Sequence, residues 1–238
     1  MNLGGSIMQI HWTKIAGIIE ENDEVRTYLL ECPEAFTWES GSFTHVGLKG
    51  FNDEENPNRN LVRHMSISTI PSEDKIGFTT RIRENPSEFK AKLKTLDIGD
   101  EVAIFRTFLN IPMRRDYKNL YLLSQGVGIA TFRPMVMDYL NDKSNINKVH
   151  SLNIDSSRNF LFKDTFLEDA HFISQFVDNR KEYYVQLEQF ATDENGVFYV
   201  VGSDEFILEN IKTLEKYGVD RENIVLDKRE DQIAQFFV

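Results

Sequence analysis

The pattern of apolar residues changes once along the chain, near residue 117, and this change constrains the fold most. Residues 8 to about 112 contain six short, alternating, strand-like runs separated by turn clusters such as "ENDE" and "PSED". Short strands at this spacing are typical of a small antiparallel barrel or sandwich. From residue 117 strand-like and helical segments alternate, which predicts a parallel sheet with helices on both faces.

These two patterns predict two domains, residues 1–114 and residues 115–238, with the boundary between Pro112 and Tyr117. In the first we expect one helix, "PSEFKAKLKTL", with Ser87 as its N-cap residue. In the second we expect helices at 130–142, 160–169 and 203–218, and strands at 119–124, 148–155, 171–178, 196–202 and 223–228.

Composition and charge exclude several classes of partner. The chain has 238 residues, 41% of them hydrophobic, so a substantial core is expected. Its net charge of −11 opposes nonspecific binding to nucleic acid and to anionic membranes. Its apolar runs are too short to cross a membrane, and its first residues show no signal-peptide pattern. We therefore expect no nucleic-acid partner and no membrane insertion.

Cysteine and histidine usage limits the cofactor chemistry. The single cysteine, Cys32, excludes an intrachain disulfide, an iron–sulfur cluster and a cysteine-bound zinc. It favours a reducing, cytoplasmic location, and we expect Cys32 to lie beneath a sheet as a small buried residue. The five histidines show no metal-ligand spacing, so no metal is expected.

Two basic clusters interrupt the acidic composition, "KAKLK" (90–94) and "MRRD" (113–116). Each has two interpretations, a solvated face or a docking site for an acidic partner or an anionic cofactor. The sequence leaves both open.

Glycine-containing turns follow two strands of the second domain. "SQGVGIATFRP" places Gly126 and Gly128 between a strand and a helix, where a phosphate or ribose can approach the helix N-terminus. "VVGSDE" places Gly202 at the end of the most apolar strand. Because position 131 is Thr, the first turn is not a G-x-G-x-x-G motif, and an ordinary strand-to-helix turn is the alternative for both.

A cation lies within a strand-like run of the first domain, "LVRHMSISTIP". The guanidinium of Arg63 has forked donors that match two phosphate oxygens. Alternation puts Arg63 and Met65 on one face and His64 and Ser66 on the other. A surface ion pair is the alternative, but the helix that begins after Ser87 adds further donors suited to an anion.

Five segments, taken in order, resemble the ferredoxin–NADP reductase superfamily of flavoenzymes over essentially the whole chain. The segments are "WESGSF", "RHMSISTIP", "SEFKAKLKTLDIGDEV", "QGVGIATFRPMV" and "FYVVGSDEFILENIKTLEKYGV". They resemble, in that order, the P-G-Q-F turn, the R-x-Y-S flavin motif, the segment that places amides near the flavin phosphates, the G-G-I-G-I-T-P-F-R-S-M motif and the Y-(V/I)-(C/A)-G-P-x-x-M segment. The resemblance implies an antiparallel β-barrel that binds flavin, followed by an α/β domain that binds NAD(P).

The resemblance also implies roles for individual residues. Arg63 would hold flavin phosphate, and Ser66, the implied catalytic residue, would hydrogen-bond near N5, the flavin atom that receives hydride. His64 and Met65 belong to the same motif, and Met65 stands where the family usually has an aromatic ring beside the flavin. The other implied flavin contacts are Thr80, Arg81, Ile82, Ser87, Glu88 and Phe89.

For the nicotinamide nucleotide the implied contacts lie in the second domain. They are Gly126, Val127, Gly128, Thr131, Gly202 and Ser203, with Ser156, Ser157 and Arg158 placed to bind the 2′-phosphate of NADP. The chain departs from the family pattern at Thr131 and Ser203, which replace prolines, and at Val201, which replaces the cysteine of plant-type members. The terminal aromatic that covers the flavin in some members would be Phe236 or Phe237.

The predicted function is an FAD-dependent oxidoreductase that passes hydride from NADPH or NADH to flavin and then electrons to an acceptor. FMN is the less favoured flavin. The acceptor would be a flavodoxin, a ferredoxin, another subunit or a small molecule. Two alternatives remain open: an enzyme that reduces a diffusible flavin or quinone, and a non-catalytic flavin-binding regulatory or docking module with a degenerate nicotinamide site.

Overall fold

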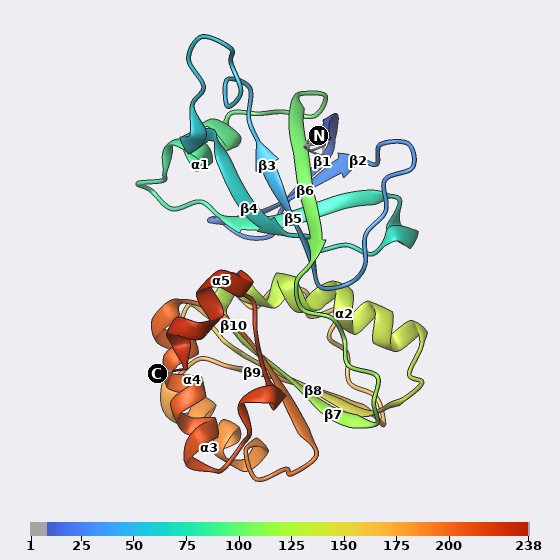
Figure 1. Ribbon diagram of the computed structural model, residues 1–238, viewed down its shortest axis with the longest axis vertical. Helices are drawn as coiled ribbons and strands as arrows, with labels where there is room; N and C mark the ends of the chain where they lie inside the picture. The colour runs from blue at the N-terminus through green and yellow to red at the C-terminus, as the bar shows by residue number, and fades with distance from the viewer. Residues whose placement is uncertain (1–8, 238) are drawn as a thin grey trace, which may run out of the picture. The chain divides into compact units, whose positions relative to one another are not determined.

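The structure is a computed structural model that describes residues 9–237 (Figure 1). It comprises two compact units, one ending at Leu109 and the other beginning at Asn110. Residues 1–8 and 238, which the domain prediction also covers, lie outside the described residues.

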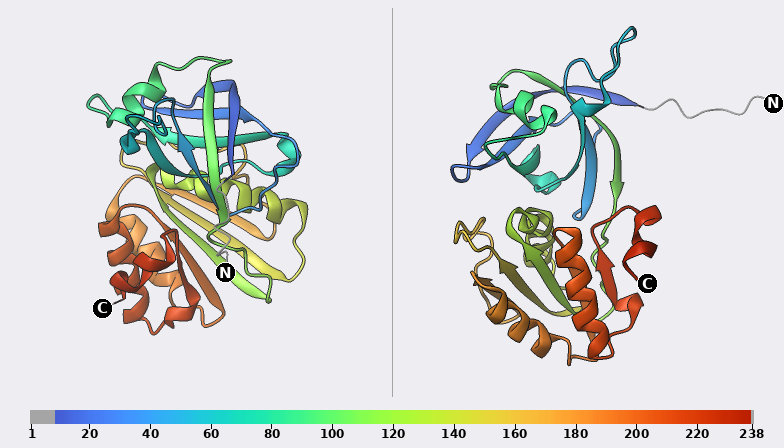
Figure 2. Two further views of the ribbon diagram at one scale, coloured as in Figure 1. Left: turned by 45° about the horizontal axis from the view of Figure 1, so that its top comes forward. Right: turned by 90° about the vertical axis from the view of Figure 1, so that its left-hand side faces the viewer.

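The first unit is a curled antiparallel sheet of six strands (Figures 1 and 2). Its strands are β1 (Ile10–Glu20), β2 (Val25–Glu31), β3 (Ser42–Gly47), β4 (Val62–Ser66), β5 (Lys75–Arg81) and β6 (Glu101–Leu109). Their order is β4-β3-β6-β1-β2-β5, and every neighbouring pair is antiparallel. The predicted antiparallel first half is confirmed as a half-barrel.

A short helix, α1 (Glu88–Lys94), closes the core of this unit. Phe89 and Leu93 stand one helical turn apart and are both fully buried in the core cluster. Burial of each side chain contributes about 2 kcal/mol. Ser87 is the N-cap residue as predicted, although its side chain makes no capping hydrogen bond. Two 3-10 turns, η1 (Arg59–Leu61) and η2 (Pro71–Glu73), flank β4.

Two predictions for this unit are wrong. The strand predicted to run to Ile70 ends at Ser66. After Ser66 the backbone is held by hydrogen bonds to side chains. The Trp38 indole donates to the Thr69 carbonyl (2.8 Å), and Thr69 Oγ1 accepts from the Gly77 amide (2.8 Å). Cys32 is exposed rather than buried, because β2 ends one residue before it.

The second unit is a parallel sheet of five strands. Its strands are β7 (Lys118–Gln125), β8 (Ile146–Ile154), β9 (Phe172–Val177), β10 (Gly196–Val201) and β11 (Ile224–Leu226), in the order β11-β10-β7-β8-β9. The helices are α2 (Ile129–Asn141), α3 (Arg180–Phe190), α4 (Asp204–Lys216) and α5 (Glu230–Ile233), with 3-10 turns η3 (Gly126–Gly128), η4 (Arg221–Asn223) and η5 (Ala234–Phe236). All six residues of β10 are buried, as its apolar sequence predicts.

The order of the strands determines which face of this sheet each connecting helix covers. From β7 the chain moves through β8 to β9 on one side of the sheet order, and then returns to β10 and β11 on the other. Right-handed crossovers then place α2 on one face and α3 and α4 on the other, as Figure 1 shows. The predicted parallel sheet with helices on both faces is confirmed.

The predicted helix at 160–169 is wrong, and a helix at 180–190 was missed. Phe162 has φ +57°, which a right-handed helix excludes, and the connection from β8 to β9 consists of turns. Its aromatic side chains pack on β9 instead, with the rings of Phe166 and Phe172 6.0 Å apart. Only Tyr183 and Leu187 are buried in α3, so its apolar stripe is too narrow to read from the sequence.

Among residues 9–237 no helix is long and apolar enough to span a membrane.

Candidate functional site

Arg63 lies in β4 with half of its guanidinium already engaged. Nη1 donates to the backbone carbonyls of Asn60 (3.0 Å) and Val62 (2.7 Å), and Cζ lies 5.7 Å from the centre of the Phe89 ring. Nε and Nη2 make no hydrogen bond to residues 9–237. The backbone and the aromatic ring thus hold the group in place and leave an edge with two parallel donors for an anion.

Further cations gather around the neighbouring Lys90. Its ammonium donates to the Arg81 carbonyl (2.7 Å). Partial burial lowers the pKa of Lys90, and the positive charges of Arg83, Arg63 and Arg81 lower it further. Glu24 already pairs with Arg81 (3.8 Å). An anion placed here would therefore chiefly relieve the mutual repulsion of Arg63, Arg83 and Lys90, which gives the cluster the electrostatics of a phosphate site. We refer to Arg63, Arg81, Arg83 and Lys90 as the cationic cluster.

The other residues predicted to contact flavin fall into two groups. Met65 packs partly buried against the core, while His64 is exposed with its ring centre 3.7 Å from that of Phe43. Ser66 is half-buried and lies opposite Phe43 in the β3–β4 register. The remaining side chains offer little to a ligand: Thr80, Ile82 and Phe89 are buried, Ser87 is exposed, and Glu88 accepts a hydrogen bond from Asn58 (2.6 Å).

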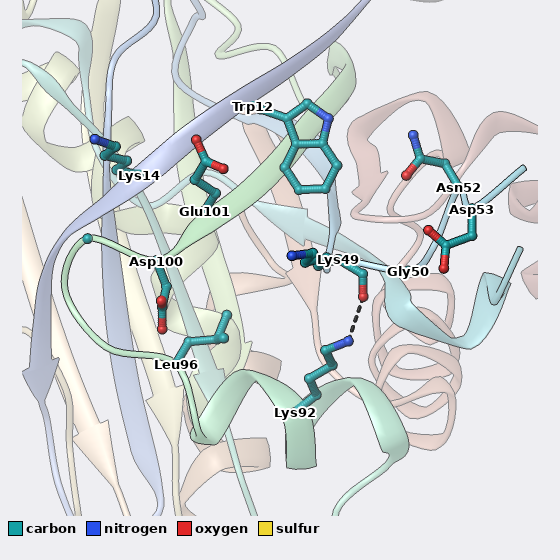
Figure 3. A pocket seen from close by; sticks show the side chains of 11 residues that line it. Trp12, Lys14, Lys49, Gly50, Asn52, Asp53, Lys92, Leu96, Asp100 and Glu101 are labelled. Atoms are coloured by element: carbon teal, nitrogen blue, oxygen red, sulfur yellow. Dashed lines mark hydrogen bonds between the residues drawn. The ribbon is translucent and has the colours of Figure 1, made fainter.

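A hollow of about 710 Å³ lies elsewhere on the first unit (Figure 3). Three lysines line it together with three carboxylates and a 41% exposed indole: Lys14, Lys49, Lys92, Asp53, Asp100, Glu101 and Trp12. Lys92 donates to the Lys49 carbonyl (2.5 Å). The carboxylates offset the lysines, so this hollow suits a diphosphate less than the cationic cluster does. The sequence analysis missed the hollow, although Trp12 and Lys14 alternate with buried residues along β1.

In the second unit the strand order reverses between β7 and β10, and the carboxyl ends of these strands carry the two glycine turns. Gly126 has φ +54°. A Cβ on Gly128 would lie 3.0 Å from the Val201 carbonyl oxygen, and a Cβ on Gly202 2.5 Å from Phe206 Cδ1. The positive φ of Gly126, the close backbone at Gly128 and the Phe206 ring at Gly202 therefore account for these glycines within the fold itself, at the switch point where open α/β sheets bind ligands.

A side chain that the sequence analysis missed crosses this switch point. Gln125, the last residue of β7, accepts hydrogen bonds at Oε1 from the Ser203 backbone amide (3.4 Å) and hydroxyl (3.0 Å). Ser203 is the N-cap residue of α4, and its Oγ accepts from the Phe206 amide (3.2 Å). The ends of β7 and β10 are thus joined by side chains as well as by the sheet.

Thr131, which the resemblance places at the nicotinamide site, is buried in the first turn of α2. Its hydroxyl donates to Asp227 Oδ2 (3.4 Å), and Asp227 Oδ1 accepts from Asn110 (2.7 Å). Thr131 therefore ties α2 to the end of β11. Val127 is half-buried within the η3 turn.

The turn after β8 holds the residues predicted to read a 2′-phosphate. Ser156 is exposed, and Ser157 donates both its amide (2.9 Å) and its hydroxyl (2.6 Å) to Asp155. The exposed Arg158 pairs through Nε with Asp178, which follows β9. The Asp178 carboxylate competes with an added phosphate for Arg158, although such an exposed ion pair contributes little stability.

The arginines of the basic cluster "MRRD" have structural roles. Arg115 donates to the carbonyls of Asp142 (2.8 Å) and Ser144 (3.0 Å) beyond the end of α2, and Arg114 pairs with Asp116 (2.7 Å). These contacts account for the "MRRD" cluster without a docking partner.

Neither aromatic at the chain end is free. Phe236 is buried in the core of the second unit. Phe237 packs against the same core, with the Arg221 guanidinium 4.4 Å from its ring centre.

The sequence matches no protein-family model and no curated protein. Solved structures resemble it over nearly its whole length. A ferredoxin–NADP⁺ reductase from Neisseria gonorrhoeae with bound FAD and NADP has a TM-score of 0.71 at 17% identity, over 92% of this chain and 98% of that one. The chain has the ferredoxin–NADP reductase-like fold.

Two other structures with this reductase-like fold extend the comparison. The CS-b5R domains of human Ncb5or, in an NAD⁺ form, give a TM-score of 0.75 at 14% identity over 96% of this chain and 72% of that one. A ferredoxin–NADP⁺ reductase from Plasmodium falciparum gives 0.70 at 13% identity over 92% and 95%. At these identities the likeness concerns the fold, so the function rests on the residues described above.

Proposed function

We propose that this chain is an FAD-dependent NAD(P)H oxidoreductase, in which hydride passes from the nicotinamide to flavin N5 and electrons pass on to an acceptor. The observation that carries the proposal is the cationic cluster, because it places four cations, of which Arg81 alone pairs with a carboxylate among the described residues, at the strand with the R-x-x-S spacing. The fold supports the same reading, since one of its structural neighbours holds FAD and NADP.

The residues present fit a flavin phosphate. The free Nε and Nη2 of Arg63 form a fork for two phosphate oxygens, and Lys90 adds a second donor from α1. Most side chains of residues 80–82 and 87–89 are buried or otherwise engaged. These two segments would therefore contact the flavin through their backbone atoms. When bound, the flavin supplies hydride acceptance and one-electron transfer.

Ser66 is proposed as the residue that touches the reacting edge of the ring. Its hydroxyl would donate a hydrogen bond near N5 and thereby orient the ring. His64 and Met65 would line the same wall, with the Met65 thioether in place of an aromatic ring and backed by the core.

The nicotinamide dinucleotide is assigned to the switch point of the second unit. Gly126, Val127 and Gly128 would face its diphosphate at the start of α2, and Gly202 and Ser203 would lie across from them. Thr131 would act indirectly by holding α2 in place. Arg158 and Ser156 would meet a 2′-phosphate only if Arg158 gave up Asp178, which favours NADH over NADPH.

The acceptor is a flavodoxin, a ferredoxin, another redox protein or a small molecule, and the cytoplasm is the proposed location. A non-catalytic flavin-binding module is the second candidate. Two observations favour it, since Thr131 and Ser203 are both engaged within the fold rather than presented to a ligand. In that case the first unit would bind flavin and the second would serve as a docking surface.

Loading the purified protein with FAD and adding NADH or NADPH without oxygen separates the two candidates. If the chain is an oxidoreductase, the visible flavin absorbance should be lost with at least one of the two nicotinamide nucleotides. A yellow protein that neither nucleotide bleaches supports the binding module, and a protein that cannot be loaded with FAD contradicts both.

A further inference from the structure

The directions of the hydrogen bonds around Gln125 are fixed by chemistry. A backbone amide can only donate, so the atom of Gln125 that faces the Ser203 amide must be the acceptor Oε1. Ser203 Oγ already accepts from the Phe206 amide, so its proton is free to point to the same Oε1. The chain of donors therefore runs from Phe206 through Ser203 to Gln125.

This arrangement leaves the other end of the carboxamide unused by the fold. Nε2 has two N–H donors, and within residues 9–237 it makes no hydrogen bond. Gln125 is exposed, so the pair of donors faces solvent at the switch point between β7 and β10.

The surroundings indicate which oxygen these donors meet. Gln125 directly precedes the η3 turn and the 13-residue helix α2, whose N-terminus favours a diphosphate. The opposite helix, α4, begins with Asp204 and Glu205, and the Asp204 carboxylate pairs with Lys228 (2.6 Å). Negative charge is therefore better accommodated on the α2 side of the switch point.

We propose that Gln125, held by Ser203, is a binding residue that donates from Nε2 to a diphosphate oxygen of the nicotinamide dinucleotide. This inference rests on the proposed function, because it assumes that the dinucleotide occupies the switch point. The family pattern has glycine at this position, so the contact is a feature of this chain's own sequence.

Two substitutions separate a donor from a purely structural bridge. In Gln125→Glu the carboxylate can still accept both Ser203 bonds, but the outward donors are replaced by a negative charge. In Gln125→Met both functions are lost at similar side-chain length. Gln189→Glu, on the exposed face of α3, adds the same charge away from the site and is the matched control.

Calorimetric titration of the full chain with NAD⁺ and with ADP-ribose, which keeps the diphosphate and lacks nicotinamide, provides the test. We expect Gln125→Glu to weaken both ligands at least tenfold and Gln125→Met to weaken both by less, while Gln189→Glu binds both as the parent does. The melting temperature of Gln125→Glu should stay that of the parent.

Parent-like affinity in both Gln125 variants would overturn the inference while leaving the proposed function intact. A loss confined to NAD⁺ would also overturn it, because the donor would then meet the nicotinamide end. If Gln125→Glu does not fold, parent-like affinity of Gln125→Met for both ligands overturns the inference. If the parent binds neither ligand, this inference and the nicotinamide half of the proposed function fall together, and FAD loading is judged separately.

Discussion

His150 should make the second unit sensitive to mild acid. Its ring nitrogens are buried without a hydrogen-bond partner among the described residues, between Tyr121 (5.1 Å between ring centres) and Phe190 (5.3 Å). Burial, and to a lesser extent the charge of Lys148, lower the pKa of His150 from 6.5 to about 4 against the opposing charge of Asp193.

The sign of the pH effect follows from which state binds more protons. Between pH 6.5 and about 4 the unfolded chain protonates this histidine and the folded chain does not, so stability falls as the pH falls through this range. At about 1.4 kcal/mol per pKa unit, the loss is about 2 kcal/mol at pH 5 and at most about 3 kcal/mol below pH 4.

Urea unfolding of the parent and of His150→Phe, followed by circular dichroism at pH 7 and pH 5, measures this loss. The ring of Phe fills the same aromatic site and cannot take up a proton, so the variant should lose about 2 kcal/mol less than the parent between the two pH values. His171→Phe, at an exposed histidine, is the control and should keep the parent's loss. An equal loss in parent and His150→Phe would refute the reasoning.

Three further predictions address the proposed sites and the switch-point packing. Arg63→Ala should weaken FAD retention roughly 10- to 100-fold by equilibrium dialysis, since a charge-assisted hydrogen bond is worth about 1.5–3 kcal/mol, whereas the exposed Arg59→Ala should retain FAD. Asp178→Asn should free Arg158 and lower the Michaelis constant for NADPH more than that for NADH; equal changes would show that Arg158 does not read the 2′-phosphate. Gly202→Ala should cost about 1–3 kcal/mol in thermal unfolding because its Cβ would meet Phe206, while Gly17→Ala, with 3.6 Å of clearance, should be tolerated.

Strongly periodic segments could be predicted from the sequence because the local spacing of apolar residues is enough to determine whether they form a strand or a helix. One of the six alternating runs of the first half became β6, and the helix predicted at 203–218 became α4 with Ser203 as its cap and Gly218, at φ +81°, beyond its end. The apolar run at 196–202 became a strand buried along its whole length. In each case burial pattern and local propensity agree.

Other parts depend on contacts that no local pattern carries. The Phe-rich segment 160–169 reads as a helix, but its rings find better packing on β9 and Phe162 takes a left-handed conformation. The charged helix α3 buries only two side chains, and the hydrogen bonds that join it to α4, of Tyr183 to Asn210 and of Tyr184 to Glu209, link residues 25 or more positions apart in sequence.

The candidate site shows the same division. Arg63 could be proposed from the sequence because its spacing to Ser66 is local, whereas Gln125 meets Ser203 across 78 residues of sequence. Lys90 was part of a cluster with two open interpretations, and its position near Arg63 and Arg81 in the folded chain is the basis for proposing an anion there. The ion pair that engages Arg158 likewise joins the ends of two separate strands.

The most direct test of the central claim is an anaerobic titration of the FAD-loaded protein with NADH, repeated with NADPH. The account predicts that the visible flavin absorbance falls linearly and reaches its end point at one nicotinamide per flavin, since each delivers one hydride. Flavin that stays oxidised with an excess of both nucleotides would contradict the claim that this chain is an NAD(P)H oxidoreductase.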